Sequence, residues 1–172
     1  MHRRIFLLGA LTATLAACEA EPLVDQAQAA TIVPGNIVVD TSAISGIEGR
    51  ELVVAPAQIN ADLIGALKTA LKRPGAPNAD VYVTVKKVQL VSRGASVAFA
   101  QSNIQAVLQV RNRAGGADII APTEITGLSE QFRLGGVIGV VTAPTAEQDY
   151  QQTIRGFAAS VGDRLFGAPA DS

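Results

Sequence analysis

Residues 81–90 read VYVTVKKVQL, and no other stretch of the chain says as much about its fold. Apolar and polar side chains alternate from Val81 to Val85, which is the two-residue period of a β-strand with one buried face. Val88 and Leu90 continue the alternation on the opposite parity. A β-bulge near residues 86–87 would return both side chains to the first face. We therefore predict a half-buried strand that contains one bulge.

The residues downstream predict further strands. Residues 104–110 repeat the alternation, and residues 112–118 contain a Gly-Gly pair that is typical of a hairpin connection. Apolar residues within 126–134 predict another strand, with Gln131 and Arg133 facing outward. Short connections between successive strands favour antiparallel pairing.

A helix is predicted upstream of the first strand. From Ile59, leucines follow at four-residue steps up to Leu71, which places them on one face of a helix. Pro56 suits the first turn of this helix, and residues 74–75, Pro-Gly, end it. Two short β-like runs come earlier, at residues 37–39 and 52–54, and either could be the first strand.

A second helix is predicted at the end of the domain. Thr145 can cap it, Glu147 suits its first turn, and apolar residues from Tyr150 to Leu165 share one face. Gly167 ends it. The resulting order is β-α-β-β-β-α. We therefore predict an α+β fold in which two helices cover a mainly antiparallel sheet of three to five strands.

The first 17 residues have the composition of a signal peptide. Arg3 and Arg4 form a positive start, and the uncharged run Ile5–Ala17 extends for 13 residues. A membrane-spanning helix needs about 20 apolar residues, so this run is too short to be a permanent span.

The run ends in Leu15-Ala16-Ala17-Cys18, which resembles the lipobox of bacterial lipoproteins. Small residues before Cys18 would admit the peptidase, and a cysteine thiol is a strong nucleophile for lipid attachment. The resemblance implies that Cys18 becomes the diacylglyceryl-modified first residue, with a further acyl chain such as palmitate on its amine. The alternative is an ordinary signal peptide followed by an incidental cysteine. A single unpaired cysteine is unusual in an exported protein, which favours lipid attachment.

These features divide the chain into four parts. We expect a signal peptide over 1–17 and a lipidated, flexible tether over 18–35. A single periplasmic α+β domain follows over 36–168, and a disordered tail over 169–172. The mature chain would have 172 minus 17, or 155, residues, which is enough for one domain with a core.

The composition of the mature chain restricts its chemistry. The only histidine, His2, precedes the cleavage site, and Cys18, the only cysteine, would carry lipid. Catalysis by Ser-His-Asp or Cys-His groups and zinc sites built from histidine and cysteine are therefore excluded. A net charge near −3 gives no reason to expect nucleic acid as a partner. We expect no enzyme activity, no cofactor and no metal.

One candidate contact site lies in residues 134–143, LGGVIGVVTA, which combine three glycines with apolar side chains. Val137 and Ile138 could contact a membrane or a partner protein. The more ordinary interpretation is a buried connection that packs on the last helix. Two charged groups have simple interpretations. We interpret the acidic group as a solvated loop rather than an acid–base or cation site. We interpret the basic group as a complement to a helix dipole, with contact to anionic head groups near the anchor as the alternative. Their members are Asp40, Glu48 and Glu51, and Lys68, Lys72 and Arg73.

With its lipobox and this order of elements, the chain resembles small envelope lipoproteins, including auxiliary lipoproteins of envelope transport systems and lipoprotein domains of unknown function. The resemblance implies a non-catalytic accessory or scaffold protein. Cys18 would hold it on the periplasmic side of the outer membrane, because Glu19 is not the aspartate that retains enteric lipoproteins on the inner membrane. The alternative function is binding of a small ligand or lipid, and a carboxylate glycosidase ranks third. The oligomeric state stays open.

Overall fold

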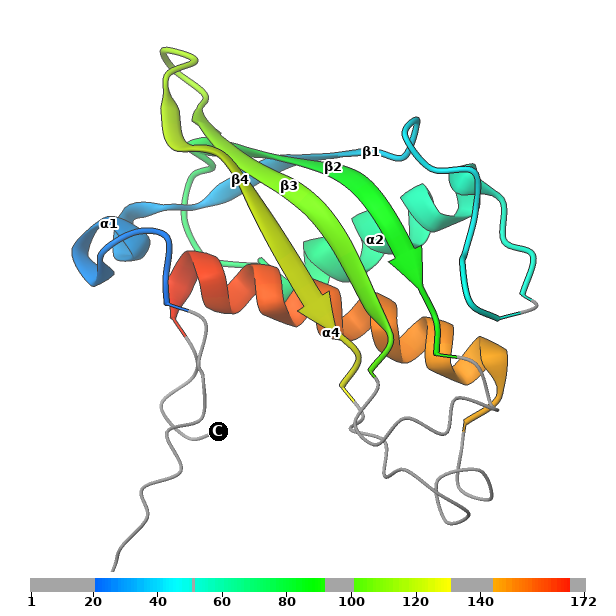
Figure 1. Cartoon of the computed structure of the whole chain (residues 1–172). Coiled ribbons are helices and arrows are strands. Elements are labelled where there is room, and N and C mark those ends of the chain that lie inside the picture. The colour runs from blue at the N-terminus through cyan, green and yellow to red at the C-terminus, as the bar shows by residue number, and fades with distance from the viewer. Residues whose placement is uncertain (1–20, 51, 92–100, 131–143, 168–172) are drawn as a thin grey trace, which may run out of the picture.

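A computed structural model describes residues 21–50, 52–91, 101–130 and 144–167. Figure 1 shows one curved sheet with two long helices on one side and a short helix at one end. The elements, in chain order, are α1 (Gln26–Thr31), β1 (Pro34–Asp40), α2 (Pro56–Ala70), β2 (Ala79–Gln89), β3 (Asn103–Asn112), β4 (Asp118–Leu128) and α4 (Ala146–Phe166).

The four strands form a mixed sheet in the order β1-β2-β3-β4. β1 runs parallel to β2 because α2 connects them as a crossover, whereas β2, β3 and β4 pair antiparallel through consecutive connections. The predicted α+β class and the largely antiparallel pairing are therefore confirmed, with one parallel pair in addition. The predicted bulge is also present, because the β2–β3 register shifts between Val85 and Lys87.

The core fills the space between the sheet and the two long helices. The predicted stripe on α2 is buried at Ile59, Leu63 and Leu67, and the α4 stripe is buried from Tyr150 to Leu165. The capping box on α4 is complete, since Thr145 and Gln148 each accept a bond from the other's backbone N–H.

The last strand differs from its prediction. β4 begins at Asp118, eight residues before the predicted run, and ends at Leu128. Gln131 and Arg133 lie outside the described residues. Leu128, expected on the face opposite to them, is 46% exposed, and the inward positions are Ile125 and Gly127. Pro122 and the adjacent isoleucines at 119–120 interrupt the two-residue alternation, which explains why the sequence pattern missed the first part of this strand.

Two glycines bring α4 unusually close to β4. A Cβ on Gly156 would lie 2.1 Å from the carbonyl oxygen of Leu128, and a Cβ on Gly127 would lie 2.6 Å from the Cα of Phe157. Helix and strand can therefore approach to this distance only where both positions lack a side chain.

The segment expected to be a flexible tether is instead part of the fold over its described residues. Asp25 caps α1, and Val24, Ala29 and Ile32 are buried against the domain. Residues 34–35 already belong to β1. The difference arises because isolated apolar residues in a polar, alanine-rich segment show no periodicity, although the finished domain offers them a surface to cover.

Of the two β-like runs, residues 37–39 form the centre of β1. Residues 52–54 belong to none of the described helices and strands, and Val53 is fully exposed. The side chain of Asn60 donates to the carbonyl of Val39, so α2 is tied directly to the edge strand.

Candidate functional site

The site residues predicted from the sequence, Cys18, Val137 and Ile138, lie outside the described residues. Among the described helices, none combines the length and apolar character that crossing a membrane requires. In the same part of the chain, no cluster of histidine, cysteine or carboxylate side chains could hold a metal ion.

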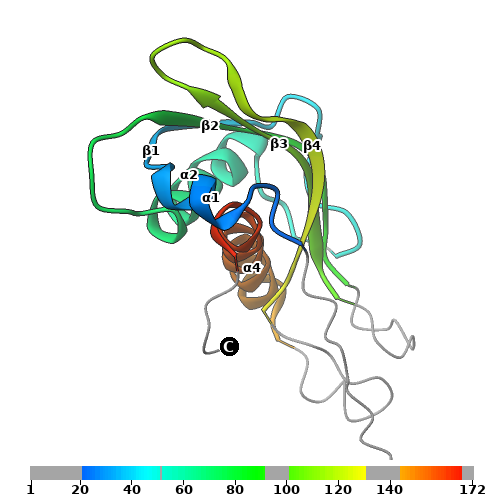
Figure 2. The same ribbon diagram turned by 90° about the vertical axis from the view of Figure 1, so that its left-hand side faces the viewer.

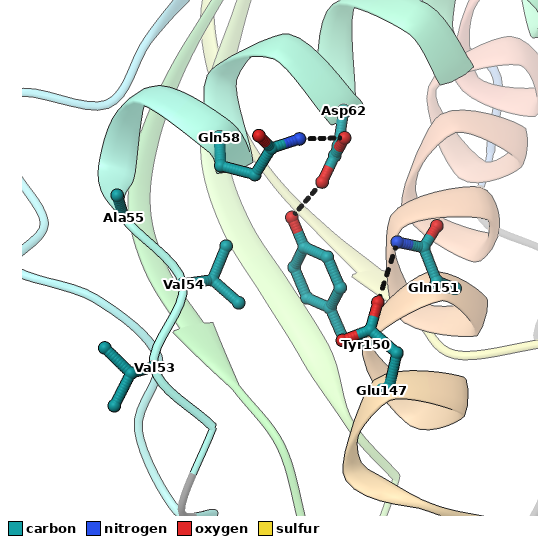
Figure 3. Close-up of a pocket in the computed structure, with 8 residues that line it drawn as sticks. All are labelled: Val53, Val54, Ala55, Gln58, Asp62, Glu147, Tyr150 and Gln151. Carbon is teal, nitrogen blue, oxygen red and sulfur yellow. Dashed lines mark hydrogen bonds between the residues drawn. The ribbon is translucent and has the colours of Figure 1, made fainter.

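A cavity of about 320 Å³ opens between the N-terminal halves of α2 and α4 (Figure 3). The extended segment that precedes α2 forms its third wall. The lining residues are Val53, Val54, Ala55, Gln58, Asp62, Glu147, Tyr150 and Gln151. We call this recess the α2–α4 cleft.

Asp62 is the centre of a short hydrogen-bond chain in the cleft. Its Oδ1 accepts from Nε2 of Gln58 at 2.8 Å, and its Oδ2 accepts from the Tyr150 hydroxyl at 2.6 Å. Figure 3 shows the Tyr150 ring reaching from α4 toward Asp62 on α2. Each carboxylate oxygen is therefore oriented by one donor, and the carboxylate is held at the cleft wall.

Burial raises the pKa of Tyr150, and the neighbouring Asp62 raises it further through the hydrogen bond and its negative charge. Desolvation and a nearby anion both oppose formation of a phenolate. Tyr150 therefore stays protonated near neutral pH and acts as a hydrogen-bond donor.

The second carboxylate of the cleft, that of Glu147, is more open to solvent. Its Oε1 accepts from Nε2 of Gln151 at 3.3 Å, one helical turn along α4. Among the described residues that line the cleft, none is a lysine, an arginine or a histidine. It therefore presents acceptors and negative charge, which match a ligand that carries N–H donors or a positive charge.

A buried ion pair lies close to the cleft, at the start of α4. Asp149 Oδ2 lies 3.4 Å from Nη1 of Arg50 and accepts from Oγ of Ser102 at 2.8 Å. Arg50 also donates to the carbonyl oxygens of Pro144 and Thr145. These bonds join three segments that are distant in the sequence, and so they fix the loop before α2 relative to the helix α4.

The charged groups singled out in the sequence do not converge on the cleft. Asp40 accepts from the backbone N–H of Ser42, which lowers the pKa of its carboxyl, and Glu48 pairs with Lys87 at 2.9 Å. Glu51 lies outside the described residues. Arg73 donates to the carbonyl of Ala29 and covers the ring of Phe166 at 4.4 Å, while Lys68 and Lys72 are exposed.

Sequence reasoning did not find the α2–α4 cleft. The available signal was a pair of polar residues four positions apart on each helix, Gln58 with Asp62 and Glu147 with Gln151. Such pairs are common on solvated helix faces. Only the packing of α2 against α4 shows that the two pairs face one recess.

No protein-family model and no curated protein matches the sequence. Similar solved structures include a protein from Caulobacter crescentus named as a candidate lipoprotein, at 16% identity and a TM-score of 0.42 over 82% of this chain and 91% of that chain. A protein from Xanthomonas campestris of the family DUF330 has 10% identity and a TM-score of 0.42 over 86% and 88% of the two chains. The PelC dodecamer from Paraburkholderia phytofirmans has 10% identity and a TM-score of 0.37 over 80% and 91%. Likenesses of this size carry no assignment of function.

Proposed function

We propose that this protein is a non-catalytic lipoprotein, anchored in the bacterial envelope through Cys18, that serves as an accessory or scaffold component of an envelope assembly or transport system. The observation that carries the proposal is the sequence Leu15-Ala16-Ala17-Cys18 at the end of an uncharged run that follows two arginines. Two or more acyl chains on one cysteine give stable membrane binding, whereas a single chain does not.

The chemistry of the α2–α4 cleft supports a non-catalytic role. Tyr150 is held as a donor, and both oxygens of Asp62 already accept hydrogen bonds. With lipid on Cys18 and the signal peptide removed, the chain has no thiol and no imidazole to act as a nucleophile or a base near neutral pH.

Anchoring is tested by expressing the full chain and a Cys18→Ser variant in a bacterial host. We expect the intact mass of the parent to equal the chain from Cys18 onward plus diacylglyceryl and acyl groups, with the protein in the membrane fraction. The serine variant should lose both properties. An unmodified Cys18 thiol, or a serine variant that still sediments with membranes, contradicts the proposal.

We place the protein on the periplasmic face of the outer membrane, with the inner membrane as the alternative. Separation of the two membranes on a density gradient tests this location.

Crosslinking in intact envelopes tests for a partner and should recover a stoichiometric protein. A Val137→Ser/Ile138→Ser variant should lose this partner without losing stability. If a stable variant still captures the same partner, Val137 and Ile138 are not part of the contact.

A second candidate function is binding of a small cationic ligand in the α2–α4 cleft. The observation that favours it is a cavity of about 320 Å³ that contains Asp62 and Glu147 and is lined by no basic side chain. A polar lining also favours a polar ligand over an acyl chain. The space between sheet and helices, by contrast, is filled by core side chains such as Leu63, Leu108 and Phe157.

This candidate is tested by titrating the folded domain with spermidine and following backbone amide shifts. We expect saturable shifts at the start of α2 and α4 that an Asp62→Asn variant loses. An Asp118→Asn variant is the matched control, because Asp118 is an acidic residue on the exposed β3–β4 hairpin. Shifts spread evenly over all acidic residues would show nonspecific attraction and exclude the site.

A further inference from the structure

We infer that one end of the domain rests on the anionic head groups of the bilayer, while the α2–α4 cleft opens away from the membrane. The membrane-facing surface, here called the anchor end, consists of residues 21–33, which include α1, the last turn of α4 and residues 68–78. Figure 2 looks directly at this end. The inference depends on the lipid attachment at Cys18 proposed above.

Only a short length of chain separates the lipidated residue from the folded domain. The backbone N–H of Leu23 donates to the carbonyl oxygen of Arg164 at 2.8 Å, on the last turn of α4. Five residue steps separate Leu23 from Cys18, and fully extended chain covers at most about 3.6 Å per step. Whatever conformation these steps adopt, Leu23 lies within about 18 Å of the lipidated residue, and the end of α4 lies one hydrogen bond beyond Leu23.

Residues 23–33, which follow this short connection, are hydrogen-bonded to the anchor end. Arg73 donates to the carbonyl of Ala29 at 2.7 Å. Asn78 donates to the carbonyl of Thr31 and accepts from the backbone N–H of Val33. Residues 23–33 are thus tied to residues 73–78 and to α4, so they cannot separate from the domain and lengthen its tether without losing these bonds.

Charge is distributed differently at the anchor end and in the α2–α4 cleft. The anchor end carries the exposed Lys68 and Lys72 beside residues 74–78, PGAPN, which are exposed and uncharged. The acidic residues of the anchor end are Glu21, Asp25 and Asp163, and its basic residues are Lys68, Lys72, Arg73 and Arg164.

The described lining of the cleft is acidic, with Asp62 and Glu147 and no basic residue, and the nearby Arg50 is paired with Asp149. A single basic residue near an anionic bilayer contributes only a weak attraction. Charge therefore only biases the tilt of the domain, and the short connection sets its distance from the bilayer.

The separation of the two ends follows from the length of α4. Fourteen residue steps lie between Tyr150 in the cleft and Arg164 at the anchor end, and a helix rises about 1.5 Å per residue, which gives about 21 Å. Figure 1 shows the start of α4 at one end of the molecule and its red C-terminus beside α1 at the other. The cleft is therefore presented to a water-soluble ligand or partner rather than to a lipid in the bilayer.

The lipidated chain allows a direct test, because Cys18 is its only cysteine and the lipid occupies that thiol. Ala76→Cys and Ala57→Cys are matched exposed positions, the first at the anchor end and the second at the start of α2 beside the cleft. Each variant of the full lipoprotein receives one fluorophore and is placed in vesicles of phosphatidylethanolamine and phosphatidylglycerol that carry a quencher on the head groups. We expect several-fold stronger quenching at position 76 than at position 57.

Equal quenching at the two positions, or stronger quenching at position 57, overturns the inference. Failure of the proposed anchoring is distinguishable, because it appears in the intact mass as an unmodified Cys18 before any vesicle experiment.

A Lys68→Glu/Lys72→Glu variant tests whether charge contributes to the orientation of the domain. It should lower quenching at position 76 in phosphatidylglycerol vesicles and leave it unchanged in vesicles of phosphatidylcholine alone. If quenching at position 76 is the same in this variant and in the parent in both kinds of vesicle, charge does not contribute to the orientation.

Discussion

The Tyr150 hydroxyl lies 2.6 Å from Oδ2 of Asp62 and joins α4 to α2 across 88 positions of the sequence. The bond joins two residues that line the α2–α4 cleft (Figure 3). It is at once a link between the two helices that cover the sheet and the feature that orients the cleft carboxylate. Its removal should therefore be visible in both stability and binding.

Replacing Tyr150 by phenylalanine should lower the free energy of unfolding by about 1 kcal/mol near neutral pH. The ring still fills its buried position, so the loss comes from the hydrogen bond and from the donor that Asp62 no longer has. Urea denaturation of the domain measures it. Tyr82→Phe is the control, because Tyr82 is the only other tyrosine and lies on the outer face of the sheet. An equal loss in both variants would contradict the special role of the Tyr150 hydroxyl.

The same tyrosine predicts a loss of stability at high pH. The pKa of Tyr150 in the folded protein lies above its ordinary value of 10.0, so the unfolded chain loses this proton first as the pH rises. The stabilisation is fully present below pH 10 and declines above it, by at most about 1.4 kcal/mol per pH unit. Denaturant midpoints between pH 8 and pH 11 measure the decline. The Tyr150→Phe variant should decline less steeply, and identical slopes would contradict the prediction.

Gly156→Ala should destabilise the domain by about 1–3 kcal/mol, because the added Cβ would meet the Leu128 carbonyl at 2.1 Å and the backbone must move. Gly65→Ala is the matched control on α2, where nothing lies within 4 Å of the new Cβ. Alanine is the better helix former, so this control should gain up to about 1 kcal/mol. Thermal unfolding of both variants makes the comparison, and a neutral Gly156→Ala would show that the helix and the strand are not held in close contact.

Asp149→Ala should lower the free energy of unfolding by about 3–5 kcal/mol, because it removes the carboxylate from a buried ion pair with Arg50. The side chains of this pair are 6% and 1% exposed. Glu130→Gln is the control, because its partner Arg155 and Glu130 itself are about half exposed and such surface pairs contribute at most about 1 kcal/mol. Chemical denaturation separates the two. Similar losses in both variants would mean that burial does not distinguish these pairs.

Ile32→Ala tests whether the segment after Cys18 belongs to the fold. Ile32 is 2% exposed, so its truncation should lower the free energy of unfolding by about 2–4 kcal/mol. Gln26→Ala, at an exposed position of α1, should change it by less than about 0.5 kcal/mol. If Ile32→Ala were as mild as the control, the segment would behave as the flexible tether that its composition suggests.

The local pattern of the sequence predicted most of the regular structure. The two-residue alternation of Val81–Val85 and the four-residue spacing from Ile59 are properties of neighbouring residues, and both are confirmed, as is the bulge before Lys87. The prediction was wrong where the pattern is weak. At the start of β4, Pro122 interrupts the alternation, and in residues 21–33 scattered apolar side chains carry no period.

The sequence alone determined the class of fold, the two covering helices and the residues of the proposed lipid site, because each depends on a short run of adjacent residues. Only the tertiary structure decided that α1 packs on the domain, that β1 runs parallel to β2, and that Asp62 meets Tyr150. Each of these is a contact between residues far apart in the chain. Such contacts arise from the packing of whole elements, which local propensity does not specify.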